Sequence, residues 1–76
     1  MNKSRRGLLS TIGSQIEDLK AQVETLKEQE QNAFDSLPEG LQCTERGQVI
    51  EEAVAHLDTS LETLQDAIDA INDAAA

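Results

Sequence analysis

The sequence predicts an all-α protein, an antiparallel two-helix hairpin of the coiled-coil type. Two segments of about thirty residues each repeat apolar residues at alternating steps of three and four. A single bend over residues 35–44 separates them and holds the only proline. Phe34 is the only aromatic residue, and Leu, Ile, Val and Ala alone can fill a seam between two helices. These observations favour two long helices that fold back on each other.

The first helix is predicted over about residues 9–36. Ser4 or Ser10 is its expected N-cap. Residues 1–8 are expected to form a basic, frayed tail, because glycine weakens the first turns. The repeat meets a polar residue at Glu30, which either fixes the register of the helix pair or is a fault near the helix end, and we favour the fault. The apolar a and d positions before it are Leu9, Ile12, Ile16, Leu19, Val23 and Leu26.

The bend is predicted over residues 37–43. Pro38 cannot continue a helix, and it restricts the residue before it to extended backbone. With Gly40 it is typical of a turn in which proline fixes one dihedral and glycine accepts a positive φ. Thr44 then serves as the expected N-cap of the second helix.

The second helix is predicted over about residues 44–73, with fraying from Asp73 onward because acids oppose the dipole at a helix C-terminus. Gly47 lies one turn inside it at an a position, which a close approach by Phe34 or by a partner backbone would explain. Small residues form a second stripe beside the a/d row, at Ala53, Ser60, Ala67 and Ala74. The outer face is acidic, with Glu51, Glu52, Asp58, Glu62, Asp66, Asp69 and Asp73.

A single hairpin of residues 9–76 would leave a long apolar edge in water. Chains this short bury a small core and often need a partner. The widened stripe of the second helix suits contact with two neighbours, so we expect two hairpins to pair into a four-helix bundle, or a higher homo-oligomer. The expected core and oligomer interface is Ile16, Leu19, Val23, Leu26, Ile50, Val54, Leu57, Leu61, Leu64, Ile68 and Ile71.

The charge distribution limits the partners of the chain. Fifteen acids stand against six bases, for a net charge of −9. Lys3, Arg5 and Arg6 supply half of the bases, and the rest of the chain repels nucleic acid and anionic membranes. No apolar run approaches the length of a membrane span, and the start is not typical of a signal peptide. We therefore expect a cytoplasmic protein without direct nucleic-acid or membrane binding.

Catalytic, metal and cofactor sites are not predicted. His56 falls on the outer face, and the inward Glu-x-x-His pattern of di-metal bundles is missing. The row of Asp66, Asp69 and Asp73 has no calcium-loop spacing, so we interpret it as a solvent face. Cys43 is the only cysteine, which excludes an internal disulfide and fits a reducing compartment, and no base stands near it to activate it. The sequence thus predicts a protein that is not an enzyme.

A further candidate site lies at the bend. Arg46 is the only base near it, and in an oligomer it could hold an anion together with the Thr44 hydroxyl and the free amides of the second helix. An ion pair with Glu39 or Glu45 is the simpler interpretation of Arg46. Lys3, Arg5 and Arg6 could likewise contact a phosphate, although a solubilising tail explains them too. The candidate ligand-site residues are Phe34, Pro38, Gln42, Thr44 and Arg46.

The strings FDSLPEGLQ (residues 34–42) and TERG (residues 44–47), followed by acidic heptads ending in DAIDAI, resemble a group of small acidic proteins of bacteria and bacteriophages. The resemblance covers residues 14–72. It implies a phage or prophage accessory protein that acts in the host cytoplasm. By analogy, some small helical phage proteins counter bacterial immunity by sequestering nucleotide signals.

Three functions are compatible with these features. The first is a non-enzymatic interaction or scaffold protein that self-associates and can bind a protein partner. The second is an anti-defence protein that sequesters a nucleotide at pockets between protomers. The third is an acidic DNA mimic that inhibits a DNA-binding protein.

Overall fold

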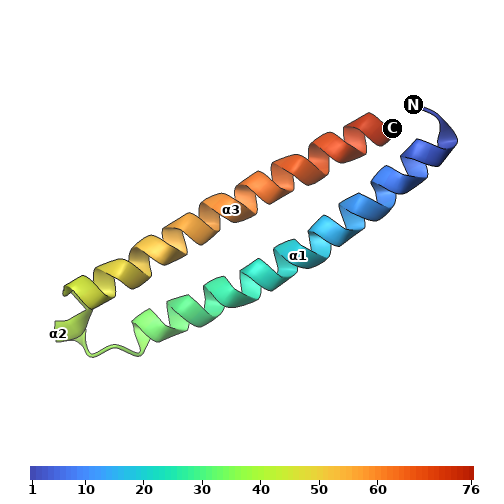
Figure 1. Ribbon diagram of the computed structural model, residues 1–76. Coiled ribbons are helices and arrows are strands. Elements are labelled where there is room, and N and C mark those ends of the chain that lie inside the picture. The colour runs from blue at the N-terminus through green and yellow to red at the C-terminus, as the bar shows by residue number, and fades with distance from the viewer.

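The computed structural model describes residues 1–76, and all of its regular elements are helices. Two long helices, α1 (Lys3–Asp35) and α3 (Glu45–Ala75), run antiparallel side by side, and the short α2 (Glu39–Gln42) lies in the bend between them (Figure 1). Both termini lie at the end opposite the bend. The Cα atoms span 58 × 14 × 12 Å, so the molecule is a thin rod. The predicted two-helix architecture is confirmed at this level.

The start of α1 lies earlier than the sequence predicts. Asn2 is the N-cap, and its side-chain oxygen accepts a hydrogen bond of 2.8 Å from the Arg5 amide. The caps predicted at Ser4 and Ser10 are wrong, because Asn2 already satisfies a free amide of the first turn. Residues 3–8 are helical in the structure, and the fraying expected over residues 1–8 stays a prediction.

The bend contains a turn of helix that the sequence does not predict. Pro38 ends the extended connection with φ −55° and ψ 144°, and α2 follows it directly. No residue of the chain has a positive φ, so the left-handed turn predicted at Gly40 is wrong. The side-chain amide of Gln42 donates to the carbonyls of Phe34 (3.3 Å) and Leu37 (3.1 Å). These bonds tie α2 to the end of α1.

Thr44 is the N-cap residue of α3, as predicted, but its side chain does not cap the helix. The hydroxyl donates instead to the carbonyl of Leu41, on the α2 side of the bend. The helix then continues to Ala75, beyond the end predicted at about residue 73.

Gly47 is buried where α2 meets α3. A Cβ atom added there would overlap the Gln42 carbonyl oxygen, and it would lie 2.6 Å from the carbonyl carbon and 2.8 Å from Cα of Gln42. The close approach predicted at Gly47 is present, but it comes from the Gln42 backbone of the same chain. Phe34 is not the residue that requires the glycine.

The inward face of α3 follows the predicted row. Its a and d positions are all buried or half-buried, whereas most of its other positions are exposed. Ile68 is the only hydrophobic side chain that is fully buried, with 2% of its surface exposed. The core of the isolated hairpin is therefore one narrow line of side chains. The residues of this row are Ile50, Val54, Leu57, Leu61, Leu64, Ile68 and Ile71.

The inward face of α1 differs from the predicted a/d row. The a positions Ile16 and Val23 pack toward α3, but the residues beside them are Lys20 and Lys27, at the e positions. The complete shielded row is Leu9, Gly13, Ile16, Lys20, Val23, Lys27, Glu30, Phe34 and Leu37.

The d positions of α1, including Leu19 and Leu26, lie outside the seam between the helices. They are therefore not part of the core of the single hairpin, and their predicted place in an oligomer interface stays a prediction. The cause is the rotation of α1 about its own axis, which lets both lysine side chains reach polar partners on α3.

Candidate self-association surface

Four large apolar side chains form an exposed row along α1. The exposed fractions are 63% for Leu8, 43% for Ile12, 53% for Leu19 and 55% for Leu26. They stand four and then seven residues apart, so they lie on one side of the helix. Isolated exposed leucines are ordinary, but large apolar side chains that recur on one side of a thin rod favour an interaction surface.

Three contacts across the seam fix the register of the two helices. Lys20 bonds to Gln65 at 2.6 Å, Lys27 pairs with Asp58, and Gly13 lies beside Asn72. The helices are antiparallel, so a contact seven residues further along α1 meets a residue seven positions earlier in α3. By this register Leu19 lies about level with Ala67, Leu26 with Ser60, and Ile12 with Ala74.

The leucine row and the small-residue stripe of α3 share one face of the rod. The polar contacts of Lys20 and Lys27 mark one flank of the seam. On α1 the d positions lie on the other flank, and on α3 the same flank holds the g positions. We call this surface the apolar face. It consists of Leu8, Ile12, Leu19 and Leu26 of α1 with Ala53, Ser60, Ala67 and Ala74 of α3.

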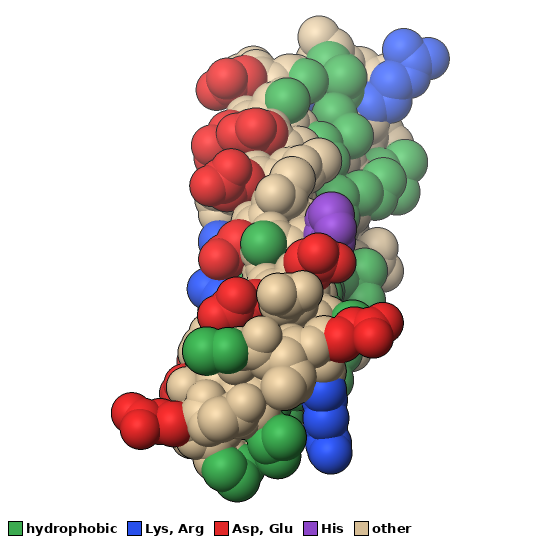
Figure 2. Space-filling model, turned by 90° about the vertical axis from the view of Figure 1, so that its left-hand side faces the viewer, with side chains coloured by type: hydrophobic (Ala, Val, Ile, Leu, Met, Phe, Trp, Pro, Cys, Tyr) green, Lys and Arg blue, Asp and Glu red, His purple; other side chains and the backbone are tan.

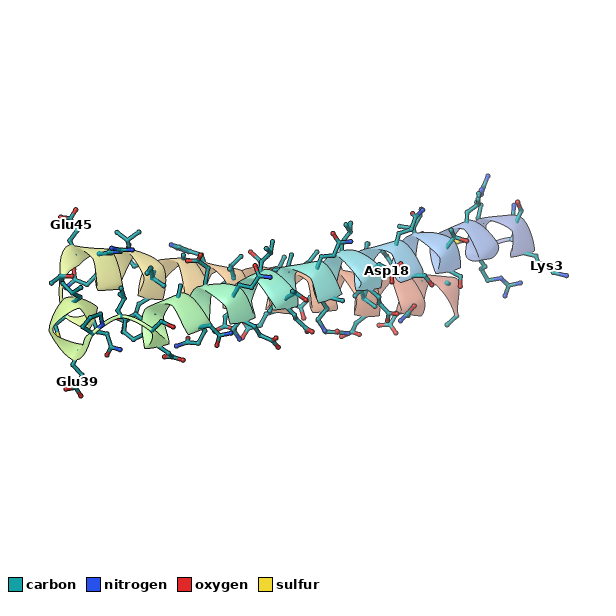
Figure 3. The ribbon with its side chains drawn as sticks, turned by 90° about the horizontal axis from the view of Figure 1, so that it is seen from below. Lys3, Asp18, Glu39 and Glu45 are labelled. Carbon is teal, nitrogen blue, oxygen red and sulfur yellow. The ribbon has the colours of Figure 1, made fainter.

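The opposite flank is polar and acidic. Gln65 also donates to Asp69 at 2.9 Å, and Lys20 lies 3.9 Å from Glu24. In Figure 2 most acidic side chains in view line one edge of the molecule, whereas hydrophobic side chains gather toward the other. Figure 3 places Lys3 at one end of the rod and Glu39 and Glu45 at the other. The hairpin as a whole is thus amphipathic across its width.

The ion pair of Lys27 and Asp58 is the only one that joins the two helices. The hydrogen bond to Asp58 raises the pKa of Lys27 above its ordinary value of 10.5. Desolvation opposes this rise in the pKa, and the negative charges of Asp58, Glu24 and Glu28 add to it. The pair therefore favours the charged lysine in the folded chain.

This shift predicts a loss of stability at high pH. Because folding raises the pKa of Lys27, the charged lysine adds to the free energy of unfolding. This contribution is complete below pH 10.5, and it is lost as the pH rises through the pKa of Lys27 in the folded chain. Urea unfolding at pH 8 and pH 11 should show a larger loss for the native chain than for Lys27→Met. Lys3→Met is the matched control, since Lys3 is exposed and outside the seam, and it should keep the native pH dependence. Equal pH dependence in Lys27→Met and the native chain would contradict the role of this pair.

The predicted ligand-site residues are partly brought together in the bend. The Gln42 amide is used by the Phe34 and Leu37 carbonyls, and the Thr44 hydroxyl donates to Leu41. Arg46 is exposed and forms no ion pair, so the alternative pairing with Glu39 or Glu45 is wrong. The chain encloses no pocket. Gln42 and Thr44 close the bend through these bonds, and the role of the five residues toward a ligand stays a prediction.

The remaining chemistry-bearing side chains lie apart from one another. Cys43 is a free, exposed thiol, and His56 is exposed on α3. No group of three or more His, Cys, Asp and Glu side chains is placed to hold a metal ion. None of the helices combines the length and apolar character that crossing a membrane requires.

No protein-family model, no curated protein sequence and no solved structure matches this chain. The resemblance of residues 14–72 to small acidic phage proteins therefore stays a prediction.

Sequence reasoning missed the polar residues that set the rotation of α1. Lys20 and Lys27 stand seven residues apart, and Asp58 and Gln65 repeat the same spacing on α3. That matched spacing, read antiparallel, is the signal that could have found them.

Proposed function

We propose that this chain is a non-enzymatic helical interaction protein that self-associates through its apolar face. Two hairpins pair into a four-helix bundle and leave their acidic flanks in water, available to a protein partner. An accessory role in a phage or prophage is in keeping with the resemblance of the bend and α3.

The exposed leucine row of α1 is the observation that supports this proposal most directly. The hairpin fully buries one hydrophobic side chain, Ile68, while Leu19 and Leu26 keep more than half of their surface in water. Fully burying a leucine contributes about 1.5–3 kcal/mol relative to leaving it exposed. Covering this row would therefore stabilise the folded chain.

The exposed surface area of the chain supports a second copy as the partner that buries the apolar face. The hairpin exposes 5485 Å², whereas a compact monomer of 8.3 kDa is expected to expose about 4,600 Å². The excess of about 900 Å² is close to the roughly 800 Å² that one partner contributes to a standard stable interface. Pairing two rods along their length would remove an excess of this size.

Replacing Leu19 and Leu26 by glutamate tests the proposal. We expect the native chain to be a dimer at micromolar concentration by size-exclusion chromatography with light scattering. The double variant should be monomeric, with its apparent Kd raised by more than about 100-fold, because two unpaired charges from each copy would enter an apolar interface. Its helicity should persist, because both positions lie outside the seam of the hairpin.

The matched control places the same charges elsewhere on α1. Ser14→Glu with Ala21→Glu also adds two glutamates seven residues apart, at exposed positions away from the apolar face. This variant should stay dimeric. A native chain that is monomeric at micromolar concentration, or equal dissociation of both double variants, would contradict the proposal.

For the nucleotide-sequestering alternative, the site would have to form between copies, because a single chain encloses no pocket. A thermal-shift panel of cyclic nucleotides, with Arg46→Ala as the comparison, tests that alternative. For the DNA-mimic alternative, the test is salt-sensitive capture of a DNA-binding protein.

A further inference from the structure

We infer that the second copy docks with its bend beside the first bend, so that each α1 packs across from the partner's α3. The inference rests on the proposed self-association and adds the orientation of the two hairpins. It follows from which side chains are large and which are small on the apolar face.

Two symmetric arrangements bring the apolar faces together. In the first, the two bends lie at the same end of the bundle, and α1 of one copy faces α3 of the other. In the second, the bends lie at opposite ends, and α1 faces α1 while α3 faces α3. Both arrangements are antiparallel four-helix bundles, so helix content does not distinguish them.

Side-chain size favours the first arrangement. The contribution of α1 to the face is large, with Ile12, Leu19 and Leu26 exposed. The contribution of α3 is small along its whole length, with Ala53, Ser60, Ala67 and Ala74. Cores reach native density when large and small side chains face each other, so α1 fits against α3 of the second copy. With the bends at opposite ends, the large side chains of the two α1 helices would face each other. The small residues of the two α3 helices would then leave a gap between those helices.

Residues that lie level with each other within one hairpin also lie level with each other across the two copies in the same-end arrangement. Leu19 lies about level with Ala67 of its own chain, and in the same-end arrangement it is level with the same alanine of the second copy. The layers of Ile12, Leu19 and Leu26 then each alternate two large apolar residues with two small residues. No sliding of the hairpins is needed to place Ile12, Leu19 and Leu26 against small residues, whereas Leu8 lies beyond the end of the α3 stripe.

The charges at the free end are compatible with this arrangement. The first turn of α1 carries bases and no acid, and the last turn of α3 carries no base. Arg5 and Arg6 form no ion pair within the chain. Same-end docking brings Arg5 and Arg6 to the same end of the bundle as the C-terminal turns of the second copy, whose acids Asp69 and Asp73 lie on the outer side of α3 and not on the apolar face. Opposite charges beside antiparallel helix ends offset the unfavourable effect of each on its own helix dipole.

The single cysteine allows a direct test. Cys43 is free, exposed and located in the bend. A nitroxide spin label on Cys43 of the otherwise native chain would report the distance between the two bends by double electron–electron resonance. Same-end docking predicts a distance below about 35 Å, since neighbouring helix axes are about 8–10 Å apart. Opposite-end docking predicts a distance that approaches the 58 Å length of the rod.

A label at mid-length supplies the matched control. Glu62→Cys in a Cys43→Ser background lies near the middle of α3 on an exposed position. Its distance should be short in either arrangement, which confirms that a dimer is present. A short distance at Cys43 supports the inference, and a long distance at Cys43 with a short one at position 62 overturns the orientation while self-association stands. Absence of any dipolar signal at both positions overturns the self-association on which the inference rests.

Discussion

Replacing Gly47 by alanine should destabilise the hairpin strongly. The added Cβ would overlap the backbone of Gln42, and a backbone atom cannot turn aside as a flexible side chain can. Either α2 moves away from α3 or the first turn of α3 unwinds. We expect the free energy of unfolding to fall by about 3 kcal/mol, at the upper end of the usual cost of overpacking. The Tm should then fall by about 12–24 °C in a chain of this size, measured by circular dichroism.

Gly40→Ala is the matched control for this variant. Gly40 lies in α2 of the same bend, and an added Cβ would meet nothing within 4 Å. Its φ is not positive, so alanine fits the backbone there. We expect no loss of stability, and a small gain from the better helix propensity of alanine. Equal Tm values for the two variants would show that Gln42 does not approach Gly47 as the structure has it.

Replacing Ile68 by alanine should have the second large effect. Ile68 is the only fully buried hydrophobic side chain, and it lies on the inward row of α3. Truncating a buried isoleucine costs about 2–5 kcal/mol, the sum of lost burial and the cavity left behind. In so thin a core this is a large share of the total stability. We expect a loss of about 3 kcal/mol in urea unfolding at fixed protein concentration.

Val49→Ala provides the comparison on the same helix. Val49 is exposed and lies away from the inward row, so its truncation should change the free energy of unfolding by less than about 0.5 kcal/mol. A similar effect at the two positions would mean that the inward row of α3 is not the core of the hairpin. Fixed protein concentration matters, because association stabilises the folded chain by mass action.

The sequence predicts which residues form the apolar face, but not that they share one face of the hairpin. The small-residue stripe and the leucines of α1 both stand out in the heptads, and both were expected at interfaces. The sequence placed Leu19 and Leu26 in the seam of the hairpin, because d positions usually face the partner helix. That assignment left no reason to expect the leucines and the small-residue stripe on one shared face.

The sequence by itself determined the two long helices, the break at Pro38 and the inward row of α3. Each of these follows from local chemistry or from a repeat without interruption, and none of the three depends on a packed neighbour. The row of α3 has one continuous apolar stripe, so only one rotation of that helix buries it.

The tertiary structure decided the rotation of α1, the Asn2 cap and the contact that requires Gly47. On α1 the d and e positions flank the same a row, so apolar pattern alone favours the leucines. Lys20 and Lys27 take the e side because Gln65 and Asp58 stand opposite them across the seam. Such pairings join residues far apart in the chain, and only the packed helices reveal them.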